Sequence, residues 1–248
     1  MRLALLADIH SNPEALDACL AHARGQGAER LALLGDLVGY AAEPGQVVER
    51  AMVLAREGAA VVMGNHDAAI DPHGLPGYMN DSARAAIEWT RSVLRPEHKA
   101  WLAALPLCLR EERLCFVHAS AHQPERFSYV DGPAAAWLSA EAADRPYTFC
   151  GHVHDQVLYF ERAPARMGSL RPTPGTPVPM GRHRRWVAIV GSVGQPRDGN
   201  TDAAYALFDT EREEIVFHRV PYDNARAEAR IREAGLPEFL AHRMRRGV

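Results

Sequence analysis

Short apolar runs alternate with longer segments of helical periodicity over the first two-thirds of the chain. Each run holds four or five residues, mostly aliphatic or aromatic, as in LALLA near the start. Such runs are typical of strands that are buried on both faces of a sheet. We therefore predict strands at residues 3–7, 31–34, 59–63, 114–117 and 147–150.

The segments between these runs have apolar residues every three or four positions. In residues 12–26 they fall on one face of a helix, with Pro13 in the first turn and Ser11 or Asn12 as the cap. The same spacing predicts helices over residues 44–57, 81–93 and 96–104. Strands that alternate with helices indicate an α/β fold, and these helices would cover the early strands.

The last third of the chain has a different pattern. Residues 157–161, 186–190, 203–209 and 215–220 predict strands joined by short links. We expect them to form a second, more antiparallel sheet packed on the first. Residues 222–235 predict a helix, and the basic residues 242–246 are expected to be a solvated tail.

Two irregular segments interrupt this organisation. Residues 67–81 are rich in Gly and Pro and follow a polar motif, so we expect them to border a cleft and to help select a substrate. Residues 163–185 contain five prolines and six basic residues, His183 included. They are expected to form an irregular excursion, either a mobile surface loop or a basic lid over an anionic substrate.

Length, charge and cysteine usage limit the class of protein. The 248 residues, 47% of them hydrophobic, fit one domain over residues 1–248. A net charge of −3 argues against strong nucleic-acid binding. No apolar stretch reaches the roughly 20 residues of a membrane span, and Met1 and Arg2 lead directly into the first strand, so we expect a cytoplasmic protein without a signal peptide.

The four cysteines form no CxxC pair, and we expect all of them to be reduced. Cys108 and Cys115 could face each other across a hairpin that turns at Glu111 and Glu112.

A short polar motif follows each of the five early strands. In open α/β sheets ligands bind at the carboxyl edge, so motifs that are far apart in sequence can meet there. The histidines of the last motif would diverge on an ideal strand, and we expect Gly151 to permit a bend. The motifs are Asp8-Ile9-His10, Gly35-Asp36, Gly64-Asn65-His66-Asp67, His118 and Gly151-His152-Val153-His154.

The residue types in these motifs predict a dinuclear metal site. Carboxylates, imidazoles and one amide, without thiolates, suit Mn²⁺, Fe²⁺/Fe³⁺, Ni²⁺ or Zn²⁺. A carboxylate such as Asp36 can bridge two cations, so that a shared water becomes a hydroxide nucleophile near neutral pH. The two cations would also hold an oxyanion. Other histidines are expected at the surface (His22, His98, His218, His242) or in loops that could approach the cleft (His73, His122, His183).

The ordered motifs DIH, GDLVGY, GNHD, VHAS and GHVH resemble the calcineurin-like metallophosphoesterase superfamily. The resemblance runs from Arg2 to Gly199 and is strongest to the small bacterial phosphatase and phosphodiesterase branch. It implies an α/β fold, a four-layer α/β/β/α sandwich with two mixed β-sheets flanked by helices. Gly39 and Ala119 depart from residues frequent in other branches, which leaves the substrate class open.

The resemblance also assigns roles to the motif residues. It implies two metal ions per chain, with Mn²⁺ expected first and Fe, Ni or Zn as alternatives. His66 would be the general acid beside the leaving group, and a hydrogen bond from its ring to Asp67 would orient it and favour its protonated form. The ligands of one metal would be Asp8, His10 and His154, those of the other Asn65, His118 and His152, with Asp36 bridging both.

Residues 191–199 form a further candidate element. Their glycines and Pro196 predict a tight loop, which is either a plain turn or a phosphate clamp carrying Arg197 and Gln195. Similar loops in the resembling branch lie near the metals. Asn12 is a weaker phosphate-binding candidate and can instead only cap the first helix.

The expected function is hydrolysis of phosphate mono- or diesters, with a small phosphorylated molecule or a phosphoprotein as the partner. A phosphoprotein (Ser/Thr) phosphatase and a dinucleoside polyphosphate hydrolase are alternatives on the same site. A non-catalytic binding scaffold is the rival class, although every expected ligand is present. The sequence does not indicate an oligomeric state.

Overall fold

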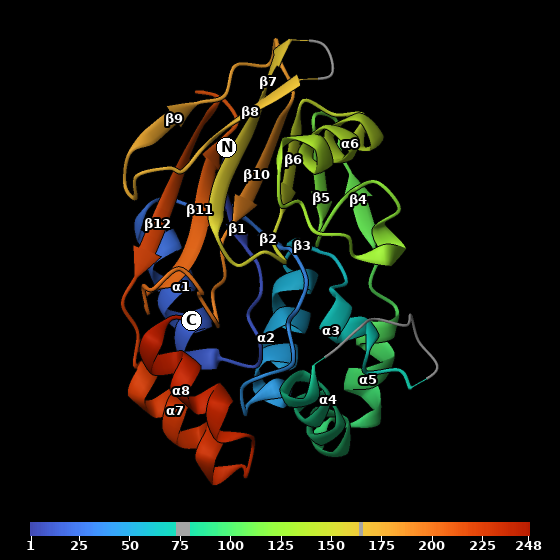
Figure 1. The fold of residues 1–248 in the computed structure, drawn as a ribbon, viewed down its shortest axis with the longest axis vertical. Helices are drawn as coiled ribbons and strands as arrows, with labels where there is room; N and C mark the ends of the chain where they lie inside the picture. Colours follow the sequence, from blue (N-terminus) through green and yellow to red (C-terminus); the bar gives the residue numbers. More distant parts are fainter. Residues whose placement is uncertain (73–79, 164–165) are drawn as a thin grey trace.

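Two mixed sheets of six strands each form the centre of the molecule (Figure 1). The computed structural model describes residues 1–72, 80–163 and 166–248. The first sheet has the strand order β3-β2-β1-β11-β12-β9 and the second β4-β5-β6-β10-β7-β8. Parallel and antiparallel neighbours occur in both. The predicted pair of mixed sheets is confirmed.

The strands have the following bounds. Those of the first sheet are β1 (Arg2–Leu6), β2 (Arg30–Leu33), β3 (Ala60–Val61), β9 (Pro177–Pro179), β11 (Ala203–Asp209) and β12 (Glu214–Val220). Those of the second sheet are β4 (Cys108–Arg110), β5 (Leu114–Val117), β6 (Tyr147–Cys150), β7 (Gln156–Ala163), β8 (Arg166–Leu170) and β10 (Trp186–Val190).

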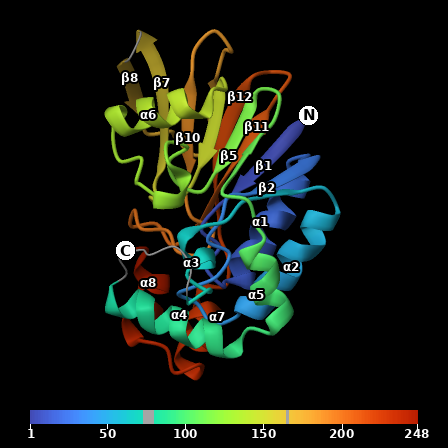
Figure 2. The same cartoon turned by 90° about the vertical axis from the view of Figure 1, so that its right-hand side faces the viewer.

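Helices cover the outer faces of both sheets, which gives four layers (Figure 2). α1 and α2 pack on the first sheet and α6 on the second, while α4, α5, α7 and α8 lie below the sheets in Figure 1. The helices are α1 (Pro13–Gly25), α2 (Pro44–Arg56), α3 (Asn65–Ala68), α4 (Asp81–Val93), α5 (Pro96–Ala103), α6 (Pro133–Ala143), α7 (Asn224–Glu233) and α8 (Glu238–Arg246), with a 3₁₀ turn at Pro124–Arg126.

The core follows from the alternation of side chains along each strand. In β1, Leu3 and Leu5 contribute to the cluster between the sheets, whereas Ala4 and Leu6 pack against the helices on the outer face. Because both faces of β1 are covered, its side chains are apolar without alternation, as the sequence indicated. Phe116 and Phe149 contribute to the inner layer from the second sheet.

Parallel strands bring the polar motifs to one edge of each sheet. β1, β2 and β3 are parallel neighbours in the first sheet, and β5, β6 and β10 are parallel neighbours in the second. All six therefore end at the same side of their sheets. The loops that follow them carry every motif identified in the sequence.

The predicted division of strands between the sheets is wrong. The later strands do not form a sheet of their own, because β11 pairs with β1 in the register Leu3↔Phe208 and β10 lies between β6 and β7. Hydrophobic patterning identifies a strand but not its partner, and these pairings join residues about 200 positions apart in one sheet and about 40 in the other.

Two segments expected to be irregular are ordered elements. Within residues 163–185, β8 extends the second sheet and β9 pairs with β12. Residues 242–246 belong to α8, in which Leu240, Ala241 and Met244 are buried. Their spacing places them on one helical face, a signal that the basic composition of the tail obscured.

Cys108 and Cys115 do face each other in the β4–β5 hairpin, with their sulfur atoms 3.5 Å apart. All four cysteines are free thiols, as expected. Among the helices in the described ranges, none combines the length and the apolar character needed to cross a membrane.

Candidate metal centre

Three overlapping groups of buried side chains converge where the parallel strands end. Within each group the potential ligand atoms lie within 4.8 Å of one another. The groups are Asp8, His10 and His154; Asp36, His118 and His152; and His10, Asp36 and His66.

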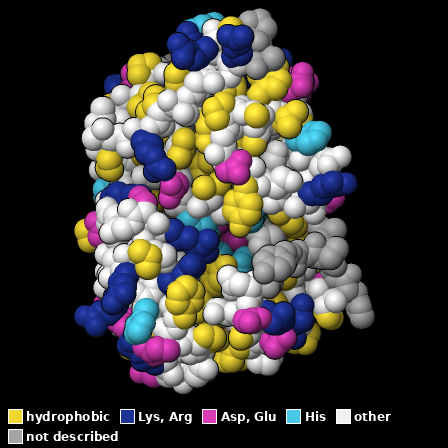
Figure 3. Space-filling model, in the orientation of Figure 1, with side chains coloured by type: hydrophobic (Ala, Val, Ile, Leu, Met, Phe, Trp, Pro, Cys, Tyr) yellow, Lys and Arg dark blue, Asp and Glu magenta, His cyan; other side chains and the backbone are white. Residues whose placement is uncertain are grey.

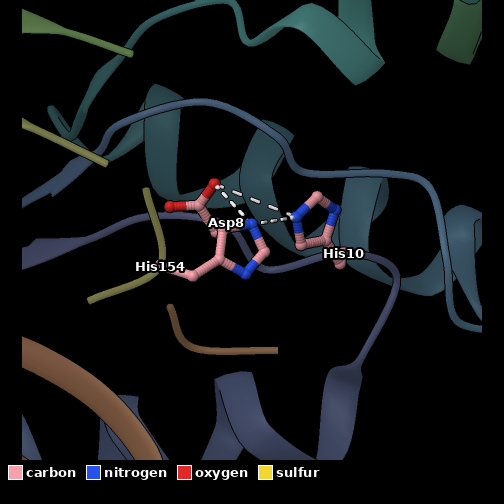
Figure 4. Close-up of side chains that lie close together, drawn as sticks. All are labelled: Asp8, His10 and His154. Atoms are coloured by element: carbon pink, nitrogen blue, oxygen red, sulfur yellow. Dashed lines mark hydrogen bonds and ion pairs between the residues drawn. The ribbon is translucent and has the colours of Figure 1, made fainter. Parts of the chain in front are cut away.

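The first group joins the loop after β1 to the loop after β6 (Figure 4). Nε2 of His154 lies 3.4 Å from Oδ1 of Asp8 and 3.2 Å from Nε2 of His10. The Asp8 carboxylate is fixed by the backbone N–H of His152, which donates to Oδ2 at 2.9 Å. Two loops that are far apart in sequence are thus joined at a single carboxylate.

The second group is centred on His118. Its Nε2 lies 3.1 Å from Oδ1 of Asn65, 3.1 Å from Nδ1 of His152 and 3.4 Å from Oδ2 of Asp36. The structure therefore brings together one amide, one carboxylate and two imidazoles, the same donors that the sequence suggested for this site.

Asp36 lies between the two groups. Its Oδ2 is 3.4 Å from Nε2 of His118 and 3.8 Å from Nε2 of His10, while Oδ1 accepts a hydrogen bond from the backbone N–H of His66 at 2.8 Å. One carboxylate oxygen thus faces both sets of donors, which is the geometry that a bridging ligand requires.

Backbone carbonyls fix the tautomers of three histidines. Nδ1 of His10 bonds the carbonyl of Val38 at 3.1 Å, and Nδ1 of His118 bonds that of Leu34 at 2.8 Å. Nδ1 of His154 likewise bonds the carbonyl of Gln195 at 2.6 Å. A carbonyl only accepts, so Nδ1 carries a proton and each ring directs Nε2 inward, with a free lone pair whenever the ring is neutral.

The Nε2 lone pairs of His10 and His154 face each other at 3.2 Å, and they repel unless a proton or a cation lies between them. The orientation of these two rings therefore fits a metal ion between them. This observation is separate from the residue types that first suggested a metal site.

Burial and neighbouring carboxylates govern the charges of this site. Burial, reinforced by Asp36, raises the pKa of Asp8 to about 7. Burial disfavours a charged His118, but the Asp36 and Asp8 carboxylates outweigh it and raise its pKa to about 9. Burial holds the pKa of His10 and of His154 well below the ordinary value. In the protein without metal His118 is thus the cationic partner of these carboxylates, whereas His10 and His154 are neutral; a bound cation would replace the proton of His118.

The backbone at the site adopts an uncommon conformation. Five donors have positive φ angles, a left-handed region in which non-glycine residues cost about 1–3 kcal/mol each. Hydrogen bonds between the loops hold this conformation, among them the one from Asp8 N to the Gly35 carbonyl at 3.1 Å. The φ angles are 54° at Asp8, 49° at His10, 51° at Asp36, 68° at His152 and 69° at His154.

Gly151 does not act as a flexible bend, contrary to our expectation. The positive φ angles belong to His152 and His154, and Gly151 is required for a different reason. A Cβ at this position would overlap the Asp8 carboxylate and lie 2.5 Å from Cβ of Ala7. The glycine therefore permits β6 and β1 to approach each other at the metal site.

Replacing Gly151 by alanine is expected to destabilise the protein by about 1–3 kcal/mol through overpacking. It should also weaken metal binding at Asp8, because the added methyl group displaces the carboxylate. Thermal unfolding and metal titration measure the two effects. Gly25→Ala is the matched control, because its Cβ would meet nothing within 4 Å. Equal behaviour of the two variants would contradict this role for Gly151.

Asp67 does not orient the His66 ring. Its carboxylate accepts hydrogen bonds from the backbone N–H groups of Leu37 at 2.9 Å, Val38 at 3.2 Å and Gly64 at 2.9 Å. Nδ1 of His66 is buried without a hydrogen-bond partner, so the predicted ring-to-carboxylate bond is absent between these two described residues. Burial lowers the pKa of His66. Asp67 instead holds together the loops that carry Asp36 and Asn65.

Of the three residues predicted to bind phosphate, Arg197 lies at the pocket, whereas Gln195 and Asn12 are buried and contact other residues. Arg197 lines the pocket beside the donors. Gln195 is buried, and its Oε1 accepts from Nη2 of Arg197 at 2.9 Å, so it positions the arginine. Asn12 is fully buried; its amide caps α1 at Ala15 and donates to the Gly194 carbonyl at 3.0 Å. The structure therefore favours the capping interpretation of Asn12.

A pocket of about 210 Å³ opens onto the donors. Figure 3 shows histidine at the base of a hollow on this face, with basic side chains along one edge. Sequence reasoning gave no role to several residues of its lining. Tyr129 stacks on His152 with ring centroids 4.1 Å apart, and Tyr40 packs against His66 at 4.5 Å. Asn80 belongs to residues 67–81, which were expected to border the cleft, and the lining residues without a predicted role are Tyr40, Ala83 and Arg243.

None of the described residues 166–185 lines this pocket, so the structure gives no support to a basic lid. Of the loop expected to select substrate, residues 73–79, including His73, lie outside the described residues.

The remaining histidines follow expectation only in part. His242 is exposed, and His22 and His218 are half-buried around Tyr205. His98 was expected at the surface but is buried. His122 and His183 are exposed and contribute nothing to the pocket lining.

Residues 1–213 match the profile of the calcineurin-like phosphoesterase superfamily domain, which is most of the chain. This chain belongs to that superfamily. The family membership inferred from the five motifs is therefore confirmed, and the phosphoesterase is a hydrolase.

Two solved structures and one sequence relative are similar to this chain over nearly its whole length. The phosphoesterase is 36% identical to a metallophosphoesterase from Sphaerobacter thermophilus, with 100% of both chains covered and a TM-score of 0.88. It is 33% identical to an uncharacterised protein of Methanocaldococcus jannaschii, covering 98% of this chain and 96% of that protein. A hypothetical protein from Pyrococcus horikoshii shares the fold at 24% identity, a TM-score of 0.78, and coverage of 100% and 98%.

Proposed function

We propose that this chain is a dinuclear-metal-dependent phosphoesterase that hydrolyses phosphate mono- or diesters. The observation that carries the proposal is the position of Asp36, whose Oδ2 faces His10 in one donor group and His118 in the other. A single carboxylate shared by two sets of inward-facing imidazoles suits a pair of cations rather than one.

The proposed ligands divide as the family resemblance suggested. One ion would be held by Asp8, His10 and His154, the other by Asn65, His118 and His152, with Asp36 shared. When bound, such ions acidify a coordinated water and neutralise charge on a phosphoryl group. The donors are nitrogen and oxygen without sulfur, which suits Mn²⁺, with Fe, Ni and Zn as alternatives.

His66 is proposed as the general acid. It shares a group with His10 and Asp36, both of which already belong to the other groups, so it adds no separate metal site. Its ring lines the pocket, and its Nδ1 faces Gly39 without a hydrogen-bond partner. Nε2 is then the nitrogen that would pass a proton to the departing oxygen.

Arg197 is proposed to stabilise the charge that develops on the phosphoryl oxygens. Its guanidinium lies over the Tyr40 ring, 5.5 Å from the centroid, and is held by Gln195. Both contacts fix the side chain before substrate binds, and a preorganised donor stabilises a transition state better than a flexible one. Asp67 contributes indirectly, because it positions the loops on either side of His66.

The proposed metal centre is compatible with a phosphoprotein phosphatase or a dinucleoside polyphosphate hydrolase as well, and no contact among the described residues of the pocket favours either. A non-catalytic scaffold has no support, because the donors, His66 and Arg197 all converge on one pocket.

Metal removal tests this function. The purified protein is expected to contain two ions per chain and to hydrolyse an aryl phosphate or a bis-aryl phosphate. Activity should disappear on chelation and return when Mn²⁺, Fe²⁺, Ni²⁺ or Zn²⁺ is added back. Elemental analysis and a substrate panel that includes phosphopeptides and dinucleoside polyphosphates give the readout. Full activity in protein stripped of metal would contradict the proposal.

A further inference from the structure

Two arginines from distant segments meet at one neutral oxygen beside the metal donors. Nη2 of Arg197 donates to Oε1 of Gln195 at 2.9 Å, and Nη1 of Arg243 donates to the same atom at 3.2 Å. Both guanidinium groups line the pocket that contains His66 and Asn65.

These two charges lack the counterions that other arginines of the region have. Arg219 pairs with Asp198 and Arg245 with Glu228, but in the described part of the chain Arg197 and Arg243 form no ion pair with a carboxylate. Nε of Arg243 is in addition buried without a hydrogen-bond partner. Burial and the charge of Arg197 lower the pKa of Arg243, as expected for a guanidinium without a carboxylate partner. Two adjacent, uncompensated cations are stabilised by a bound anion.

The second arginine is supplied by a fixed element. α8 lies beyond residues 1–213, the part of the chain that matches the superfamily. It is nevertheless anchored to the Arg197 loop, because the N–H of Gly199 donates to the Gly247 carbonyl at 2.8 Å. Leu240 and Met244 are buried on its inner face. The C-terminal helix therefore holds Arg243 at the pocket before substrate binds.

We propose that Arg243 is a specificity-determining residue that, with Arg197, selects phosphomonoesters over phosphodiesters. This inference rests on the proposed function. A monoester dianion has three non-bridging oxygens. It could therefore contact the metal ions held by the donor residues and still offer an acceptor oxygen to the two arginines. In a diester, one of these oxygens carries an ester group and the charge falls to −1, so the second arginine loses its partner.

Arg243→Gln tests the selection. Gln keeps the helix propensity and removes the charge. Because a charge-assisted hydrogen bond contributes roughly 1.5–3 kcal/mol, we expect kcat/KM for an aryl phosphate to fall about 10- to 100-fold. For a bis-aryl phosphate with the same leaving group it should change less than about threefold. The inhibition constant of inorganic phosphate should rise by about the factor by which kcat/KM for the aryl phosphate falls. For Arg243→Lys, which keeps the charge without the planar guanidinium, kcat/KM for the aryl phosphate should lie between the values of the wild type and Arg243→Gln.

Arg246→Gln is the matched control, because it removes the same charge from an exposed position of the same helix. It should match the wild type on both substrates. Equal losses on monoester and diester in Arg243→Gln, or a wild-type preference for the diester, would overturn the inference and leave the proposed function intact. Failure of the metal-loaded wild type to hydrolyse either substrate would instead contradict the proposed function. Thermal unfolding shows whether a loss of activity is due to misfolding. If Arg243→Gln is unstable, the activity of Arg243→Lys and its inhibition by phosphate decide the inference.

Discussion

The Asp36→Asn protein is expected to lose tight binding of at least one metal ion and, with it, phosphoesterase activity. Asp36 lies between the donor groups, with Oδ2 3.4 Å from His118 and 3.8 Å from His10. Asparagine preserves the shape and the hydrogen bond from His66 N but removes the charge that two cations would share. Because loss of an outer-shell partner already weakens metal binding about 10- to 100-fold, loss of a bridging ligand should exceed that range.

Elemental analysis after dialysis measures this effect, and thermal unfolding gives an independent readout. A ligand that binds only the folded protein stabilises it in proportion to its affinity, so added Mn²⁺ should raise the melting temperature of the wild type and not that of the variant. Without metal the variant should be less stable than the wild type, because the Asp36 carboxylate compensates the buried charge of His118.

Asp17→Asn is the control for Asp36→Asn. It makes the same chemical change on α1 at a half-exposed side chain whose ion pair with Arg50 is a surface interaction of small energy. Two tightly bound ions and full activity in Asp36→Asn would refute the bridging assignment.

The His66→Ala protein is expected to bind two metal ions while its turnover falls by about 10²- to 10⁴-fold, the usual contribution of a general acid. The size of the loss should depend on the leaving group. An alkoxide needs a proton to depart, whereas a nitrophenolate does not, so the defect should be large for an alkyl phosphate and small for a nitrophenyl phosphate. A kinetic comparison of the two substrates at constant metal content measures this difference.

His122→Ala is the matched control, because His122 is an exposed histidine outside the pocket lining. Loss of metal from His66→Ala would mean that His66 is a ligand, as its place beside His10 and Asp36 allows. An equal defect on good and poor leaving groups would exclude proton donation.

The strand-end motifs were readable from the sequence because their physics is local. A short apolar run predicts a buried strand, and a polar motif directly after it lies at the carboxyl edge wherever that strand sits in the sheet. Asp8, Asp36 and His118 therefore could be proposed as neighbours without knowledge of the strand order. The strand order itself was not predictable, because the positions of β11 and β10 in the two sheets depend on tertiary packing.

The contacts around the donor residues were less predictable from the sequence. Gln195 and Asp67 were given direct roles toward phosphate and toward His66, and Asn12 was either a phosphate-binding residue or a helix cap. In the structure all three hold backbone or side-chain groups in place: Asn12 at Gly194, Gln195 at Arg197, and Asp67 at Leu37. A polar residue beside a motif has several possible partners within a few ångströms, and only the folded chain determines which one it meets.

By itself the sequence determined the fold class, the superfamily and the polar residues that gather at the strand ends, because each depends on residue type and on position relative to a strand end. The tertiary structure alone decided that Gly151 makes room for Asp8, and that α8 carries Arg243 to the pocket. The physical reason is the same in both cases. A close approach between strands and the burial of one helical face join residues that are far apart along the chain, and local pattern carries no information about such distances.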